Sequence, residues 1–112
     1  MIQKWIFLGH KELADIRILR KQGRLDEAEK LLLGGEPSEA VLDELRKTYS
    51  QKAHAARRSN DWITVLKYLE AYITYAQKWG WYCRKMVNAN PPSHTEQDKQ
   101  LLEEAKNKLG KT

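Results

Sequence analysis

Apolar residues recur at helical spacing along most of the chain, and the pattern is clearest between Trp62 and Val87. At about 100° per residue, one set of apolar side chains in this stretch falls on a single stripe. A second stripe beside it is aromatic and consists of Tyr68, Tyr72, Tyr75, Trp79 and Tyr82. Together the two stripes cover roughly 200° of the helix surface, more than the arc of a helix that rests on one core. We therefore expect a long central helix with neighbours on two sides.

Shorter amphipathic segments separated by turn residues make up the rest of the chain. The pattern predicts three helices within 10–59, the central helix within 60–90 and a last helix within 93–109. Ser93 and Glu96 fit a capping box at the start of the last helix. Gly80 falls inside the central helix, and we expect that helix to continue through it despite the cost of a helical glycine. The apolar segment 1–9 should pack on the body of the protein or on another copy of the chain.

A length of 112 residues suits one domain, spanning 1–112, with a modest core. No apolar run approaches the roughly 20 residues that a membrane-spanning helix needs. The apolar opening is followed by charged residues without a small-residue cleavage site, so we expect no signal peptide and a cytoplasmic protein. The single cysteine, Cys83, lies on the apolar stripe of the central helix and should be a buried structural residue.

Charges alternate in blocks along the chain. Residues 1–24 and 46–60 are rich in lysine and arginine, whereas residues 25–45 are rich in acids. These blocks could attract one another within the fold or present separate patches to partners. The helical pattern places five acids of the middle block on solvent-facing positions, namely Asp26, Glu27, Glu29, Asp43 and Glu44.

Catalytic and metal-binding motifs are missing from the sequence. His10, His54 and His94 lie on three different predicted elements, and none has a metal-ligand spacing. There is no phosphate-binding glycine loop and no serine nucleophile motif. We therefore expect neither an enzyme nor a cofactor, and we predict no catalytic or metal-binding residue.

The segment GRLDEA at positions 23–28 lies between the first two predicted helices. Aligning Gly23 with Asn60, at an offset of 37 residues, makes helix, tight turn and helix occur twice. GRLDEA resembles the turn of a tetratricopeptide repeat, and the resemblance covers about residues 10–76. It implies a right-handed stack of antiparallel helix pairs whose concave face binds peptides, with the fifth helix as a C-terminal cap. Ile16 stands where the family has a small residue, and neither pair ends with the family's proline.

A protein interaction module is the function that these features favour, with a protein or peptide as the partner. The predicted partner-binding residues all lie on the central helix and are Tyr68, Tyr72, Tyr75, Trp79, Trp81, Arg84 and Lys85. The aromatic stripe could line a groove, or it could simply be core. Trp81 points about 140° away from that stripe, and we expect the N-terminal segment to cover it.

Two alternative functions remain open. Nucleic acid could bind a basic face of the third helix, formed by Arg46, Lys47, Lys52, Arg57 and Arg58. Alternatively, the apolar N-terminus and the central helix could hold a small homo-oligomer together.

Overall fold

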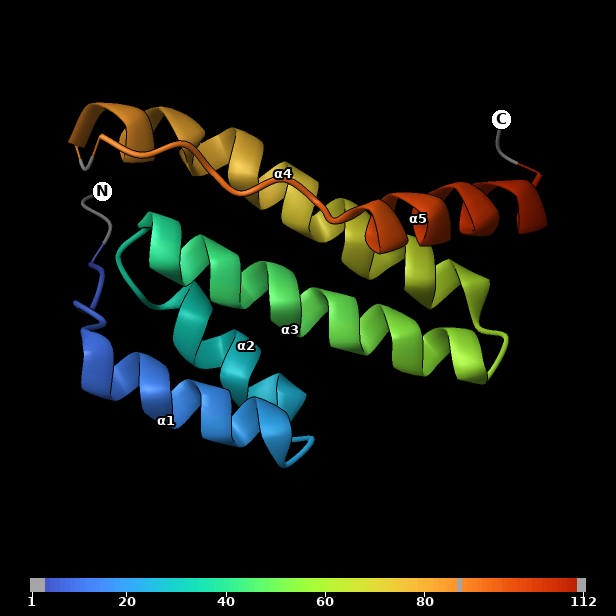
Figure 1. Cartoon of the computed structure of the whole chain (residues 1–112), viewed down its shortest axis with the longest axis horizontal. Helices are drawn as coiled ribbons and strands as arrows, with labels where there is room; N and C mark the ends of the chain where they lie inside the picture. The colour runs from blue at the N-terminus through green and yellow to red at the C-terminus, as the bar shows by residue number, and fades with distance from the viewer. Residues whose placement is uncertain (1–3, 87, 111–112) are drawn as a thin grey trace.

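The computed structural model describes residues 4–86 and 88–110. Five α-helices follow one another in these residues: α1 (His10–Lys21), α2 (Leu25–Leu33), α3 (Glu39–Arg58), α4 (Trp62–Met86) and α5 (Glu96–Lys108). Consecutive helices from α1 to α4 run in opposite directions and pack side by side, which confirms the prediction of an all-α fold built from antiparallel helices (Figure 1). Residues 1–3 of the predicted N-terminal segment, Val87 at the end of the apolar stripe, and residues 111–112 lie outside the described part of the chain.

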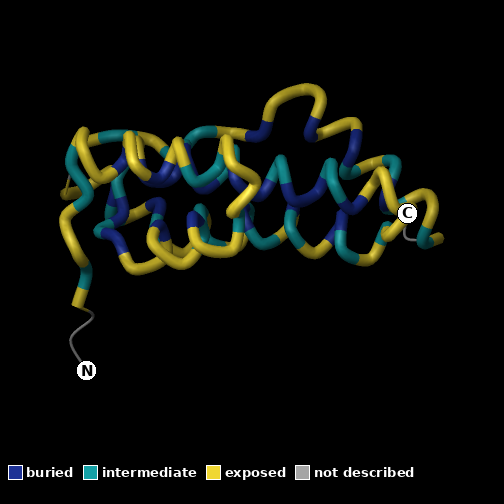
Figure 2. Tube along the Cα trace, turned by 90° about the horizontal axis from the view of Figure 1, so that it is seen from below, coloured by how far each residue is buried: buried dark blue, intermediate teal, exposed yellow. Residues whose placement is uncertain are grey.

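The core lies between α3 and α4, the two longest helices. Buried residues line the inside of the helix layers and exposed residues cover the outside (Figure 2). One buried cluster joins α1, α2, the first half of α3 and the C-terminal half of α4. A second cluster joins the end of α3, the start of α4 and α5. Because α3 and α4 contribute to both clusters, they hold together the two smaller groups of helices.

The turns after α1 and α3 have the same local structure. Gly23 has a φ angle of 79°, and Asn60 has a φ angle of 56°. After each of them, the next N–H donates to a carbonyl five residues back, Arg24 to Leu19 and Asp61 to Ala56, both at 2.9 Å. Glycine adopts this left-handed conformation freely and asparagine tolerates it. The predicted helix stop at Gly23 and break at Asn60 are therefore both confirmed.

α4 is a single uninterrupted helix, as predicted, and it continues through Gly80. A Cβ atom at Gly80 would stand 3.2 Å from Pro91 Cγ. Gly80 therefore lets residues 88–95, here called the strap, run back close along α4 towards α5 (Figure 1). Although α4 has 25 residues, none of the described helices is both long and apolar enough to cross a membrane.

The start of α5 differs from the predicted capping box. The helix begins at Glu96, and the side chain of Thr95 accepts a hydrogen bond from the Asp98 N–H at 3.2 Å. The prediction of Ser93 as the cap was wrong. A threonine beside the first helical residue serves the same purpose as a serine, and Ser93 is still part of the extended strap.

The described part of the N-terminal segment packs on the body of the protein, as predicted. The Ile6 N–H donates to Gly34 O, and the Glu36 N–H donates to Ile6 O, each at 2.9 Å. A Cβ atom at Gly35 would lie 2.8 Å from Leu8 Cγ, closer than such atoms approach one another. Only glycine at position 35 allows the segment to lie this close to the turn between α2 and α3.

Candidate partner-binding surface

Most residues of the aromatic stripe of α4 pack against other parts of the fold. Tyr72 is only 2% exposed, and its hydroxyl donates a hydrogen bond to the carbonyl of Pro92 in the strap. The ring of His94 lies against the Tyr72 ring, with centroids 5.2 Å apart. Tyr68 stacks on Tyr49 of α3 at 5.8 Å. Of the two interpretations of this stripe, a core and an open groove, the geometry favours the core.

The N-terminal segment covers the other end of the stripe. The Trp5 ring meets the rings of Trp79 and Tyr82 edge to face, with centroid distances of 4.7 and 5.0 Å. The Tyr82 hydroxyl donates to a carboxylate oxygen of Glu36 at 2.5 Å. This hydrogen bond raises the pKa of Tyr82, because it favours the protonated phenol. Trp79 and Tyr82 are thus occupied by contacts within the chain.

Tyr72 and Tyr75 of α4 are expected to respond differently to loss of the hydroxyl. Tyr72→Phe should lower the free energy of unfolding by about 1 kcal/mol, because it removes a buried hydrogen bond to the strap. Tyr75→Phe should be neutral or stabilising by up to about 1 kcal/mol, because the Tyr75 hydroxyl is buried without a partner among the described residues. Urea denaturation of the two variants tests the pair. Equal losses of stability in both would contradict the assignment.

The described part of the N-terminal segment, residues 4–9, does not cover Trp81, contrary to the prediction. Its side chain is 52% exposed, and its neighbour Met86 is 63% exposed. The ring touches only the edge of Tyr82 among the described aromatic residues, at 5.9 Å between centroids. The reason is geometric: Trp5 lies over the face of α4 that carries Trp79 and Tyr82, and Trp81 projects from a different face.

Three cations lie within four residues of Trp81 on α4. Lys78, Arg84 and Lys85 are exposed, and none of them forms an ion pair with another described residue. Lys78 and Lys85 lie three residues before and four residues after Trp81, a spacing that puts them on the same face of a helix. The stretch 71–95 contains no aspartate or glutamate. We call the surface formed by Lys78, Trp81, Arg84 and Lys85 the α4 patch.

Most of the basic residues that were predicted to form a nucleic-acid face are in ion pairs with acidic residues of the same chain. Lys52 is only 8% exposed and binds Asp26 and Glu29 of α2, the latter at 2.7 Å. Burial opposes its charge, but these hydrogen bonds prevail and raise the pKa of Lys52. The remaining ion pairs are Arg46 and Lys47 with Asp43, and Arg57 with Glu104. Of the five predicted residues, Arg58 alone forms no ion pair within the described part of the chain. The alternating charge blocks therefore meet one another inside the fold.

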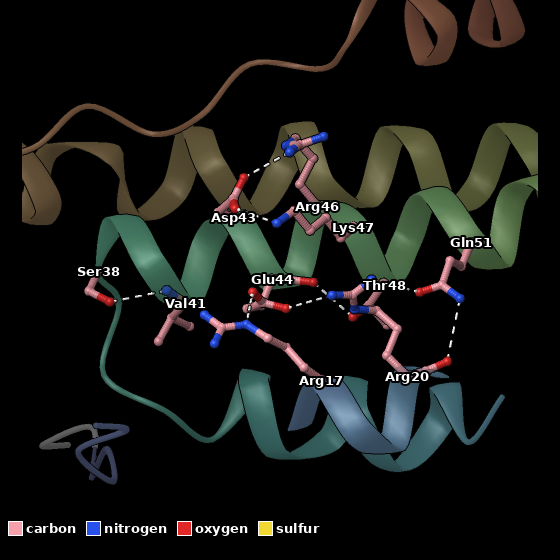
Figure 3. Close-up of polar contacts among 10 residues, drawn as sticks. All are labelled: Arg17, Arg20, Ser38, Val41, Asp43, Glu44, Arg46, Lys47, Thr48 and Gln51. Carbon is pink, nitrogen blue, oxygen red and sulfur yellow. Dashed lines mark hydrogen bonds and ion pairs between the residues drawn. The ribbon is translucent and has the colours of Figure 1, made fainter. Parts of the chain in front are cut away.

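Glu44 lies between α3 and α1 and is buried, so its predicted solvent-facing position was wrong. Its carboxylate accepts hydrogen bonds from Arg17 Nε at 2.7 Å and from Arg20 Nη2 at 3.1 Å (Figure 3). Arg20 also donates to the side chain of Gln51 at 3.1 Å. α1 packs across this face of α3, which periodicity within α3 alone does not reveal. The cluster holds two helices together.

No family model, curated protein or solved structure matches the chain. Any function must therefore be argued from the chain's own residues.

One polar cluster contains a serine, a histidine and an aspartate, as the catalytic sites of hydrolases do, but its hydrogen bonds are arranged differently. Ser50 Oγ donates to Asp98 Oδ1 at 2.8 Å, and His54 Nε2 lies 3.2 Å from the same oxygen. The serine is therefore bonded to the carboxylate and not to the histidine that would have to activate it. This cluster attaches α5 to α3. Elsewhere in the described residues, no group of acids, histidines and cysteines could hold a metal ion.

Cys83 is completely buried in α4, as its place on the apolar stripe predicted. Burial raises the pKa of its thiol, which keeps it protonated and unreactive. Of the predicted partner-binding residues, Trp81, Arg84 and Lys85 are exposed together, whereas Tyr72 is buried and Tyr68, Tyr75 and Trp79 are half-buried. Sequence reasoning missed Lys78 as a member of the same surface, although the helical spacing around Trp81 could have indicated it.

Proposed function

We propose that this protein is a non-enzymatic interaction module that binds an acidic, partly apolar segment of another protein through the α4 patch. The observation that carries the proposal is the half-exposed Trp81, with three cations within four residues of it on α4 that have no ion-pair partner in the described residues. Tryptophan and arginine are the residues that contribute most often to binding energy in protein interfaces. An acidic partner would complement the positive charge.

A TPR-like arrangement of the helices is part of this proposal. It is supported by the matching turns at Gly23 and Asn60, which each join two antiparallel helices. α5 would serve as the cap of such a stack, because its exposed residues are polar or charged throughout its described length. In this arrangement, the α4 patch lies on a helix that is held from both sides, so the patch is presented on a rigid support.

A protein partner agrees better with the charges than nucleic acid does. Four of the five candidate phosphate-binding residues on α3 already form ion pairs with carboxylates. A phosphate would have to displace these carboxylates.

Trp81→Ala is expected to weaken binding of an acidic peptide by at least about tenfold, since it removes the central apolar anchor. The probe is a fluorescein-labelled peptide in which glutamates alternate with leucine and phenylalanine, and the readout is fluorescence anisotropy. The matched control is Ile63→Ala, which removes an exposed apolar side chain, 70% accessible, at the other end of α4. This control should bind the peptide as the parent protein does.

Two further arms make the outcome decisive. A lysine-containing version of the peptide should not bind, and a single-stranded oligonucleotide should bind weakly or not at all. Equal affinity of the parent protein and Trp81→Ala for the acidic peptide would overturn the proposal. Tight oligonucleotide binding with a steep salt dependence would favour the nucleic-acid alternative. Light scattering of the free protein shows separately whether it forms the alternative homo-oligomer.

A further inference from the structure

A groove of about 580 Å³ lies between the C-terminal half of α4, the strap and the start of α5. Its volume is within the range of roughly 300–1,000 Å³ that is typical of small-ligand sites. Its apolar lining comes from three elements and consists of Tyr72, Ile73, Ala76, Pro91, Pro92 and Leu102. Most of these side chains are only half-buried. The groove therefore offers apolar surface that the fold itself does not fully cover.

Two cations stand at the groove, and no acid lines it. Arg84 reaches back along α4, so that its Nη1 would be 3.1 Å from a Cβ atom at Gly80. The other cation is Lys99 of α5, whose Nζ lies 3.4 Å from a carboxylate oxygen of Glu96. Both side chains of that pair are more than half exposed, and such surface pairs are weak. The local charge therefore favours an anion.

His94 lines the groove and carries a buried polar atom without a partner among the described residues. Its side chain is buried, and its Nε2 lies 3.0 Å from Leu69 O. A carbonyl only accepts hydrogen bonds, so Nε2 must carry the hydrogen. Nδ1 is then an acceptor in the neutral ring, and it is buried without a partner among the described residues. An unpaired buried acceptor costs free energy, which a ligand with an N–H or O–H group could recover.

We propose that this groove binds a small amphipathic carboxylate that carries a hydrogen-bond donor next to its head group. The carboxylate lies between Arg84 and Lys99, the donor bonds to His94 Nδ1, and the apolar chain covers Ile73, Ala76 and Leu102. The two cations favour a ligand with a negatively charged head group, and the half-buried apolar lining favours one with a hydrocarbon tail. The site is separate from the peptide surface proposed above and shares only Arg84 with it.

N-octanoylglycine tests the proposal, because it combines a carboxylate, an adjacent amide N–H and an apolar chain. Isothermal titration calorimetry should give a Kd of about 1 mM or below. Its neutral methyl ester should bind about tenfold more weakly. Octanoate, which lacks the amide, should bind with an affinity between those of the acid and the ester. Lys99→Gln should weaken binding of N-octanoylglycine about fivefold to tenfold, and so should Arg84→Gln.

Lys85→Gln is the control that separates the two sites. Lys85 belongs to the α4 patch and does not line the groove. Lys85→Gln should therefore weaken binding of the acidic peptide and leave binding of N-octanoylglycine unchanged. Lys99→Gln should show the reverse. Since Lys99 and Lys85 are both exposed, neither change should disturb the fold, and circular dichroism verifies this. The proposal is overturned if acid and ester bind equally, if Lys99→Gln has no effect, or if N-octanoylglycine does not bind at millimolar concentration.

Discussion

Replacing Glu44 with alanine is expected to lower the free energy of unfolding by about 3 kcal/mol, because it leaves two arginines without their shared carboxylate. The Glu44 side chain is 2% exposed, and that of Arg20 only 17% exposed. Arg20 Nε is already buried without a partner among the described residues, so loss of Glu44 would leave most of this guanidinium unpaired. The Arg17 side chain is 45% exposed, so without Glu44 its guanidinium can be solvated by water. The expected loss of stability is therefore near the lower end of the values for broken buried ion pairs. Urea denaturation should show a lower midpoint with an unchanged m value.

Glu27→Ala is the matched control, because Glu27 also forms an ion pair with an arginine. Its partner Arg24 lies 2.6 Å away, but both side chains are more than half exposed. Exposed pairs of this kind contribute between about 0 and 1 kcal/mol. A loss of stability in Glu27→Ala as large as that in Glu44→Ala would show that burial is not what makes the Glu44 cluster important.

Raising the pH from 10 to 12 is expected to remove several kcal/mol of stability. Burial raises the pKa of Tyr72 and of Tyr75 from the usual 10 to about 12. Between these values, the unfolded chain releases the phenolic protons while the folded protein retains them. The unfolded state then binds fewer protons, so stability falls as the pH rises, by up to about 1.4 kcal/mol per pH unit for each tyrosine. Below pH 10, this contribution is fully present.

Urea denaturation at a series of pH values between 8 and 12 measures this loss, and the ultraviolet absorbance of tyrosinate shows when ionisation occurs. Lys52 acts in the same direction, because its raised pKa also makes its contribution disappear in alkali. Tyr72→Phe separates the two effects: the variant should lose less stability than the parent protein over this range. An unchanged midpoint from pH 8 to pH 12 in the parent protein would refute the assignment.

Helix positions could be predicted from the sequence because their signals are local. The stop at Gly23, the break at Asn60 and the long periodic stretch of α4 each depend on a few neighbouring residues. The cap of α5 was misassigned by two positions, since Ser93 and Thr95 have similar capping chemistry.

Burial of polar residues was harder to predict. The periodicity of α3 places Glu44 on its hydrophilic side, but α1 covers that side and supplies two arginines. Asp98 is buried in the same way, by Ser50 and His54 of α3. In both cases, the residue's surroundings are set by a helix distant in sequence.

The candidate site was predicted in part, for a related reason. Trp81, Arg84 and Lys85 are close in sequence on one helix, so their proximity needs no tertiary information. Whether Trp81 would be covered depended on where Trp5 packs, and Trp5 packs on Trp79 and Tyr82 instead. The groove beside the strap could not be foreseen, because it exists only where the strap returns along α4 and meets α5.

The contact between Trp5 and Trp79 bears on the order in which the fold assembles. The most extensive helix packing joins helices that are neighbours in the chain, and such contacts close short loops quickly. Trp5 must instead meet a residue in the last third of the chain, which costs more loop-closure entropy and requires α4 to be in place first. We therefore expect the N-terminal segment to dock late in folding, onto a helical body that has already formed.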